Sequence, residues 1–250
     1  MMLSLDTIRL GVPEVADAQR FYADTFVPAD VVAVHGAEEL AADAATKPAT
    51  SGFRGYVMSY VVSQPSEVRF VLDAAVRAGA TVLKPAKKSL FGAFSAVYQA
   101  PDGAIWKLSA PTKKDTGPAA EPPAPTETAA LLGVAEPKAT KEFYTALGMT
   151  ADRDYGNKYI DFRPTPGTAR LALMTRPVLA KDVGVAADGS GFSSVVLGAR
   201  AESPESVEAI LAAAASAGGR VVNPAVETEQ GGYAGSFADP DGFVWQIAYE

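Results

Sequence analysis

An internal repeat constrains the fold of this chain more than any other feature of its sequence. Residues 101–108 read PDGAIWKL and residues 240–247 read PDGFVWQI, which is an offset of 139 residues. The same offset holds without a gap across residues 52–108. Because self-similarity at a fixed spacing indicates a repeated structural unit, we expect the chain to fold as two related copies.

The two copies differ near their starts. Phe21-Tyr22 corresponds to Phe143-Tyr144 at an offset of only 122, so the first copy lacks 17 residues between this pair and Gly52. A segment rich in proline and alanine separates the copies, and its composition predicts a semi-extended linker that can cross the face of a domain. The predicted boundaries are 1–109 for the shortened first copy, 110–126 for the linker and 127–250 for the second copy.

The composition is that of a globular protein. The 250 residues are 48% apolar and 20% charged, which suffices for two domains that each bury a core. A net charge of -7 disfavours a nucleic-acid surface, because phosphate binding needs clustered lysine and arginine. No apolar stretch is long enough to span a bilayer, and the sequence has no cysteine for a disulfide or a thiolate metal site. We expect a cytoplasmic protein with no nucleic-acid and no membrane partner.

Each copy alternates between strand-like and helix-like hydrophobic periodicity. Residues 7–12 alternate with a period of two, as in a strand, and residues 15–26 carry an apolar stripe with helical spacing. Residues 53–62 predict a strand, residues 66–78 a helix, and three short strands end at Leu108. The second copy repeats this order. The predicted class is therefore α+β, with two strand–helix–strand–strand–strand units, written βαβββ, in each copy.

These features together resemble the vicinal-oxygen-chelate superfamily, which includes glyoxalases, bleomycin-resistance proteins and dioxygenases. The resemblance rests on the paired βαβββ units, on the Phe-Tyr pair late in the first helix of each copy, and on the Pro-Asp-Gly triplets before the last strands. The segment 143–149 looks much like glyoxalase-type sequences. The resemblance covers nearly the whole chain. It implies curved sheets around a cavity, with histidine and glutamate ligands on cavity-facing strands in the metalloenzyme members.

The positions that would carry the metal ligands hold other residues here. By the resemblance they fall on Thr7 and Ala129 in the first strands, near Ala172 in the fourth strand of the second copy, near Phe53 and Phe192, and on Lys107 and Gln246 in the last strands. Because divalent ions in such sites take imidazole and carboxylate ligands, we expect no metal and no other cofactor. His35, the only histidine, lies in the shortened stretch between Phe26 and Ser51, and we expect it at the surface or at a strand edge.

Strand alternation assigns the side chains that would line the cavity. Residues at even spacing from the former ligand positions share their face, whereas Trp106 and Trp245 turn towards the helices as core residues. The predicted ligand-binding residues are Thr7, Arg9, Phe53, Lys107, Met174, Arg176, Phe192, Tyr233 and Gln246. Three of them have structural alternatives, Arg176 as a salt-bridged rim residue, Lys107 as one partner of an ion pair between the copies, and Tyr233, which could form a lip over a planar guest, as a residue of sheet packing. Lys107 is also the candidate catalytic base.

Three classes of function follow, and we rank them in this order. The first is a metal-independent binding protein that sequesters a hydrophobic or aromatic ligand, with an anionic group left open, in a cavity between βαβββ units. The second is an enzyme of the glyoxalase, dioxygenase or isomerase type that uses Lys107 or a cavity carboxylate as its base, with metal-dependent catalysis disfavoured. The third is an interaction module without a guest, marked by a cavity filled with side chains. The sequence leaves open the ligand, the choice between the two pseudo-equivalent cavities, and whether two chains form a homodimer.

Overall fold

The two copies fold into the same kinds of element. The structure is a computed structural model that describes residues 3–25, 31–88, 93–229 and 231–250. The first copy forms β1 (Thr7–Val12), α1 (Val15–Thr25), β2 (Val32–Gly36), α2 (Ala37–Asp43), β3 (Thr50–Gly52), β4 (Tyr56–Val61), α3 (Pro65–Arg77), β5 (Thr81–Lys88), β6 (Phe94–Gln99) and β7 (Ile105–Ala110).

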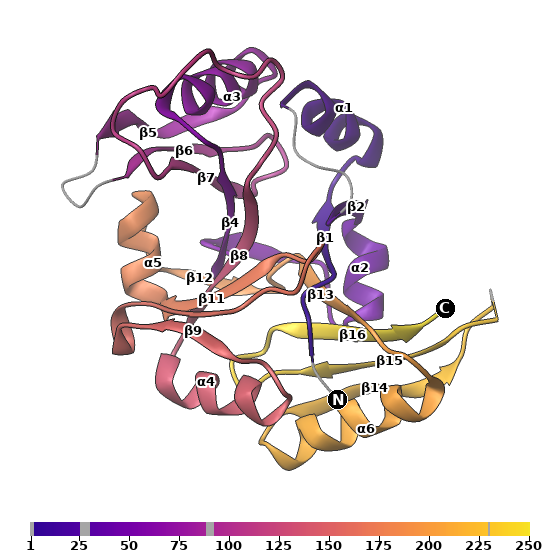
Figure 1. Cartoon of the computed structure of the whole chain (residues 1–250). Coiled ribbons are helices and arrows are strands. Elements are labelled where there is room, and N and C mark those ends of the chain that lie inside the picture. Colours follow the sequence, from indigo (N-terminus) through magenta and orange to yellow (C-terminus); the bar gives the residue numbers. More distant parts are fainter. Residues whose placement is uncertain (1–2, 26–30, 89–92, 230) are drawn as a thin grey trace.

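The second copy adds the elements β8 (Glu127–Val134), α4 (Pro137–Ala146), β9 (Ala151–Asp154), the short 3-10 helix η1 (Gly156–Lys158), β10 (Ile160–Phe162), β11 (Arg170–Thr175), α5 (Arg176–Val183), β12 (Gly189–Gly191), β13 (Val195–Arg200), α6 (Pro204–Ser216), β14 (Arg220–Glu227), β15 (Tyr233–Ala238) and β16 (Val244–Tyr249). The α+β class and the curved sheets expected from the sequence are confirmed (Figure 1).

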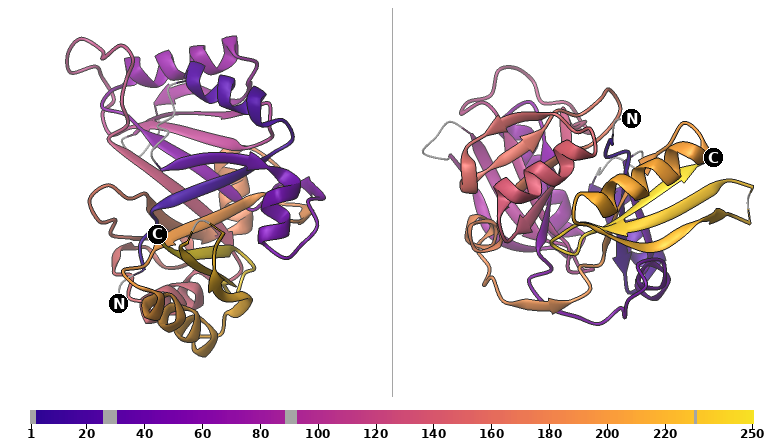
Figure 2. Two further views of the ribbon diagram at one scale, coloured as in Figure 1. Left: turned by 90° about the vertical axis from the view of Figure 1, so that its right-hand side faces the viewer. Right: turned by 90° about the horizontal axis from the view of Figure 1, so that it is seen from below.

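Both large sheets combine strands of the two copies. A six-stranded sheet has the order β14-β15-β16-β13-β1-β2, and an eight-stranded sheet has the order β5-β6-β7-β4-β8-β11-β10-β9. The copies meet where β1 pairs antiparallel with β13 and where β4 pairs antiparallel with β8. The first and last parts of the sequence, indigo and yellow, therefore lie in one sheet (Figures 1 and 2). The boundaries 1–109, 110–126 and 127–250 delimit repeats of sequence, whereas the sheets cross them.

The shortening of the first copy falls between α1 and β2. The offset of 139 already relates α2 to α5, so the register begins earlier than residue 52. In the second copy β9 and β10 precede the strand equivalent to β2, and the described part of the first copy has no counterpart of them. The first unit is thus βαβ, which corrects the predicted βαβββ order. Residues 26–30, at the start of this stretch, lie outside the described residues.

The outer faces of the sheets are covered by α1, α3, α4 and α6, and the repeated sequence motifs meet in this core. The Tyr144 hydroxyl donates to Asp239 Oδ2 over 2.6 Å, and Trp245 Nε1 donates to the Tyr144 oxygen over 3.0 Å. In the first copy Tyr22, Asp102 and Trp106 make the same contacts. Both tryptophans are fully buried, so their predicted core position is confirmed.

The two copies take the tyrosine's carboxylate partner from different positions. Asp102 belongs to the first Pro-Asp-Gly triplet, but Asp239 precedes the second one. The triplet's own aspartate, Asp241, instead accepts hydrogen bonds from Ala135 N at 2.7 Å and from the Thr140 hydroxyl at 2.6 Å. Asp241 therefore ties the residue that precedes the N-cap of α4, and the first turn of that helix, to the turn between β15 and β16.

Burial makes Asp239 a source of pH dependence. Burial raises the pKa of Asp239 to about 7, while the Tyr144 hydroxyl and the Phe243 and Asp241 amides oppose this rise. Because the folded-state pKa lies above that of the unfolded chain, the folded protein binds more protons between about pH 4 and pH 7, and its stability falls as the pH rises through this window.

We predict that Asp239→Asn removes part of this pH dependence. Urea unfolding of the wild type should show a loss of stability of at least about 1 kcal/mol between acidic and neutral pH that is absent from the variant. Asp73→Asn, which changes an exposed carboxylate on α3, is the matched control and should keep the wild-type dependence. An identical pH profile for Asp239→Asn and the wild type would contradict the assignment.

Candidate functional site

The inner face of each large sheet carries a helix that the sequence analysis did not predict. On the six-stranded sheet, α2 buries Leu40 and Ala41 in a cluster with Phe192, Val196 and Val244. On the eight-stranded sheet, α5 buries the equivalent pair in a second cluster, whose members include Leu179, Ala180, Phe53, Val57, Ile105 and Ala172. Figure 1 shows α2 beside β1 and β13, and α5 beside β11. The repeated Leu-Ala pair at offset 139 was a signal for these helices.

The former metal-ligand positions do not fit a divalent ion. Phe53 and Phe192 are 5% and 7% exposed and pack beneath the two helices, and Ala129 and Ala172 lie in the apolar cluster under α5. Within the described part of the chain, no three histidine, cysteine, aspartate or glutamate side chains come together to hold a metal ion. The side chains present therefore cannot chelate a metal at the place that the resemblance implies.

The former first-strand and last-strand ligand positions of each sheet lie in one cross-strand row. In the six-stranded sheet the row runs through Thr7, Gly198, Gln246, Ser236 and Asn223. In the eight-stranded sheet the equivalent row runs through Ala129, Ser59, Lys107, Val97 and Lys84. The two rows hold different side chains, which make different contacts on the two inner faces.

In the eight-stranded sheet, two lysines of the row hold the end of α5. Lys107 Nζ lies 2.5 Å from Asp182 Oδ2, and Lys84 Nζ donates to the main-chain oxygens of Lys181 and Asp182 over 2.8 and 2.5 Å. Lys107 belongs to the first copy and Asp182 to the second, which is the structural alternative foreseen for this lysine. An ammonium that donates to a carboxylate is not placed to accept a proton, so the geometry gives no support to Lys107 as a base.

In the six-stranded sheet, an arginine from β1 ties the end of α2 to the row. Arg9 Nη2 lies 2.7 Å from Asp43 Oδ2, Arg9 Nη1 donates to Gln246 Oε1 over 2.6 Å, and Arg9 Nε donates to His35 Nε2 over 3.3 Å. Asn223 Nδ2 donates to the Asp43 main-chain oxygen over 2.6 Å, as Lys84 does to Asp182. Burial and the Arg9 guanidinium lower the pKa of His35. The predicted residues Arg9 and Gln246 are thus in direct contact.

The two rows differ in the length of their side chains, and a cleft lies over the six-stranded sheet. Asn223, Ser236 and Gln246 occupy the positions of Lys84, Val97 and Lys107. The cleft has a volume of about 290 Å³, and these three side chains line it together with Asp43, Val196 and Val244. Asn223 and Gln246 are half-buried in this lining, whereas Ser236 is buried and its hydroxyl accepts hydrogen bonds from Asn223 N and Nδ2 over 3.2 and 2.9 Å.

Three other predicted residues lie in different places. The Tyr233 hydroxyl donates to Glu208 Oε1 of α6 over 2.7 Å, so Tyr233 lies on the outer face of the six-stranded sheet and not on its inner face. Arg176 is the first residue of α5 and not part of β11, because the strand ends at Thr175. Met174 is half-buried against the cluster under α5. The prediction that Arg176 lies on the fourth strand of the second copy is wrong, whereas ligand binding by Tyr233, Arg176 and Met174 stays a prediction.

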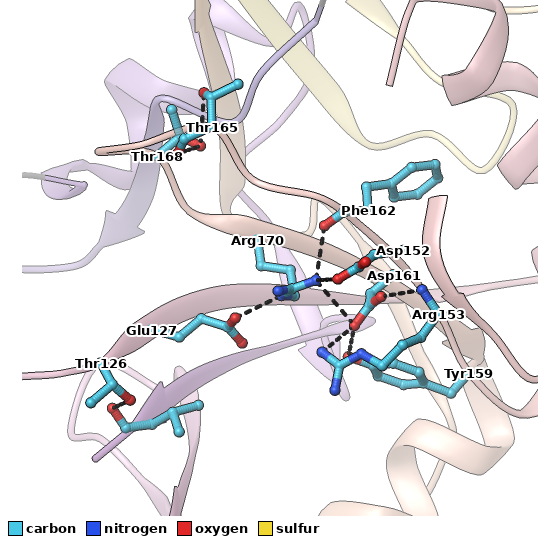
Figure 3. Close-up of polar contacts among 11 residues, drawn as sticks. Thr126, Glu127, Asp152, Arg153, Tyr159, Asp161, Phe162, Thr165, Thr168 and Arg170 are labelled. Carbon is cyan, nitrogen blue, oxygen red and sulfur yellow. Dashed lines mark hydrogen bonds and ion pairs between the residues drawn. The ribbon is translucent and has the colours of Figure 1, made fainter. Parts of the chain in front are cut away.

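A charged cluster at the edge of the eight-stranded sheet also escaped the sequence analysis (Figure 3). Arg170, 12% exposed, lies 2.7 Å from Glu127 and 3.0 Å from Asp152 through its Nε and Nη1 atoms. The fully buried Asp161 contacts both Arg170 and Arg153, over 3.4 and 2.5 Å. Since each arginine meets carboxylates within the cluster, we assign it the structural task of holding β9 and β10 on β11.

Arg176 and Phe192 come together in a second cleft. The guanidinium of Arg176 lies over the Phe53 ring, 5.2 Å from its centroid, and Nε donates to the Ala187 oxygen over 2.9 Å. This cleft has a volume of about 450 Å³, and its lining also includes Arg54 and Arg220.

Comparison with known proteins agrees with this architecture. Glyoxalase I from Zea mays superposes with a TM-score of 0.65 at 16% identity, covering 99% of this chain and 92% of that one. A putative dioxygenase from Bacillus subtilis superposes with a TM-score of 0.61 at 16% identity, covering 100% and 85%. Both likenesses extend over the whole chain and show that it has the vicinal-oxygen-chelate fold.

The family follows from the sequence of the second copy. Residues 128–247 match the model of the Glyoxalase/Bleomycin resistance protein/Dioxygenase superfamily. The second copy therefore contains a domain of this superfamily, and the internal repeat relates the first copy to it. No curated protein sequence matches the chain significantly. None of the helices that the structure describes is long and apolar enough to cross a membrane.

We predict that α2 and α5 are integral parts of the core. Leu40→Ala and Leu179→Ala each remove a fully buried side chain and should lower the free energy of unfolding by about 2–5 kcal/mol in urea titrations. Val178→Ala, on the same helix as Leu179 but 38% exposed, is the control and should change it by less than about 1 kcal/mol. Equal effects of Leu179→Ala and Val178→Ala would show that α5 does not pack on the sheet.

Proposed function

We propose that this protein binds a hydrophobic or aromatic small molecule, without a metal, in the cleft over the six-stranded sheet. One observation carries the proposal. The row that holds lysines and a valine in the eight-stranded sheet holds Asn223, Ser236 and Gln246 in the six-stranded sheet, and a cleft of about 290 Å³ accompanies these residues. Of the two pseudo-equivalent inner faces, the proposal therefore selects this one.

The lining of the cleft indicates the chemistry of the guest. Val196, Val226, Val244 and Pro224 supply apolar walls, while the half-buried carboxamides of Asn223 and Gln246 can orient a polar substituent. Asp43, Glu227 and Glu229 add carboxylates to the lining. Because these charges repel an anion, the cleft favours a neutral or cationic aromatic compound over an anionic one.

Catalysis of the glyoxalase or dioxygenase type receives less support from the same residues. The similar structures carry such names, but their identity to this chain is 16%, which relates the folds alone. The metal positions do not fit a metal, and Lys107 is engaged with Asp182. Binding without chemical conversion requires neither.

An interaction module without a guest is the second candidate. The observation in its favour is that α2 and α5 occupy the inner faces with buried apolar side chains. Under this alternative the residual cleft binds nothing, and the repeat supplies a rigid surface. A ligand-binding measurement separates the two candidates.

We predict that binding weakens when residues of the eight-stranded row are placed at the equivalent positions of the six-stranded sheet. The neutral fluorophore N-phenyl-1-naphthylamine should bind the wild type saturably, and Asn223→Lys combined with Ser236→Val should weaken it by at least about tenfold, because a lysine stem then occupies the cleft. Lys84 and Val97 already form this pair in the other sheet, so the fold should accept the change.

A control variant completes this test. Ser216→Lys adds the same charge on the exposed surface of α6 and should leave binding unchanged. Absence of saturable binding to the wild type would favour the interaction module. Equal binding by the wild type and the double variant would remove the cleft from the proposal.

A further inference from the structure

The second cleft lies where segments of both copies meet, away from the six-stranded row. Its lining comes from the residues after α2, the end of β8, the turn before β13 and the turn between β15 and β16. Three arginines line its volume of about 450 Å³, namely Arg54, Arg176 and Arg220. Such a volume is in the range of small-molecule sites.

None of these three guanidinium groups has a carboxylate partner in the described part of the chain. Arg54 Nη2 donates to the Asp102 main-chain oxygen over 2.7 Å, and Arg176 donates to the main-chain oxygens of Ala187 and Phe53. The guanidinium of Arg220 has no side-chain hydrogen bond or ion pair with any residue that the structure describes. Main-chain oxygens carry no net charge, so three positive charges stay uncompensated by these contacts.

The carboxylate in the cleft lining is already engaged. Asp241 accepts hydrogen bonds from Ala135 N over 2.7 Å and from the Thr140 hydroxyl over 2.6 Å, one on each oxygen. By contrast, Arg9 and Arg170 elsewhere in the chain each pair with a carboxylate. In a chain with a net charge of -7, a cleft with three arginines and one engaged aspartate is a local excess of positive charge.

The position of Arg176 is fixed by the backbone around it. A Cβ atom on Gly55 would lie 2.5 Å from Arg176 Nη1, and one on Gly189 would lie 2.8 Å from Nη2. Gly55 and Gly189 leave room for the guanidinium, which donates to the main-chain oxygens of Ala187 and Phe53. A cation held in place before binding loses little conformational entropy when an anion arrives.

We propose that this cleft is a binding site for a small aromatic anion, a carboxylate or a phosphate ester. Guanidinium groups match the paired oxygens of both anions with parallel hydrogen bonds. Phe192 and Phe243, 7% and 5% exposed, add apolar surface to the lining for the remainder of the guest. The site shares Val244 with the six-stranded cleft but differs from it in charge, since the carboxylates of that cleft disfavour an anion.

Calorimetric titration of the full-length protein tests the site. Phenyl phosphate and benzoate should bind with an affinity that falls as the salt concentration rises, and inorganic phosphate should bind more weakly than phenyl phosphate. Arg220→Gln, which changes an exposed side chain, should weaken the binding of phenyl phosphate by at least about tenfold. Arg200→Gln, an exposed arginine at the end of β13 outside the lining, is the matched control and should leave it unchanged.

The outcomes separate this site from the proposed function. Arg220→Gln should not alter N-phenyl-1-naphthylamine binding, and the Asn223→Lys and Ser236→Val changes should not alter phenyl phosphate binding. No binding of phenyl phosphate or benzoate, or an equal loss in Arg220→Gln and Arg200→Gln, would overturn the inference. Equal affinity for inorganic phosphate and phenyl phosphate would overturn its aromatic part.

Discussion

The two antiparallel strand pairings that join the copies within the large sheets are the constraint on which the rest of the structure depends. The pairing of β1 with β13 sets Thr7 opposite Gly198, and the pairing of β4 with β8 sets Ser59 opposite Ala129. Since successive side chains of a strand point to opposite faces, a slip of one residue in either pairing would move Arg9 or Lys107 from the inner face to the outer face. Gly198 permits the first pairing, because a Cβ there would lie 2.1 Å from Thr7 Oγ1.

The same register explains how a fold associated with metal sites holds together without their ligands. In both sheets the aspartate at the end of the inner helix, Asp43 or Asp182, is bound from the row that the metal ligands would occupy. The side chains at these positions make polar contacts to a helix. The buried leucines of α2 and α5 contribute apolar contacts that an open, solvated cavity would lack.

Much of this arrangement could be read from the sequence, because the motifs involved are local. The Phe-Tyr pairs, the Pro-Asp-Gly triplets and the alternation around Trp106 and Trp245 gave the fold class and the faces of the last strands. The position of Tyr233 on the outer face was not predicted, although the signal was present. Phe237 is paired with the buried Trp245, and Tyr233 shares its face at even spacing. Arg176 failed because β11 ends one residue earlier, and α2 and α5 are too short for a clear helical period.

Fusion of the two copies frees their inner faces from having to change together. In a dimer of identical chains, every substitution appears in both faces at once. Here the row of the eight-stranded sheet holds lysines that contact α5, whereas the row of the six-stranded sheet holds asparagine, serine and glutamine. Among the described residues, β9 and β10 occur in the second copy alone. Because each sheet draws strands from both copies, one half can keep the architecture intact while the other acquires new side chains. Two related copies within one chain thus present two inner faces whose side chains can differ.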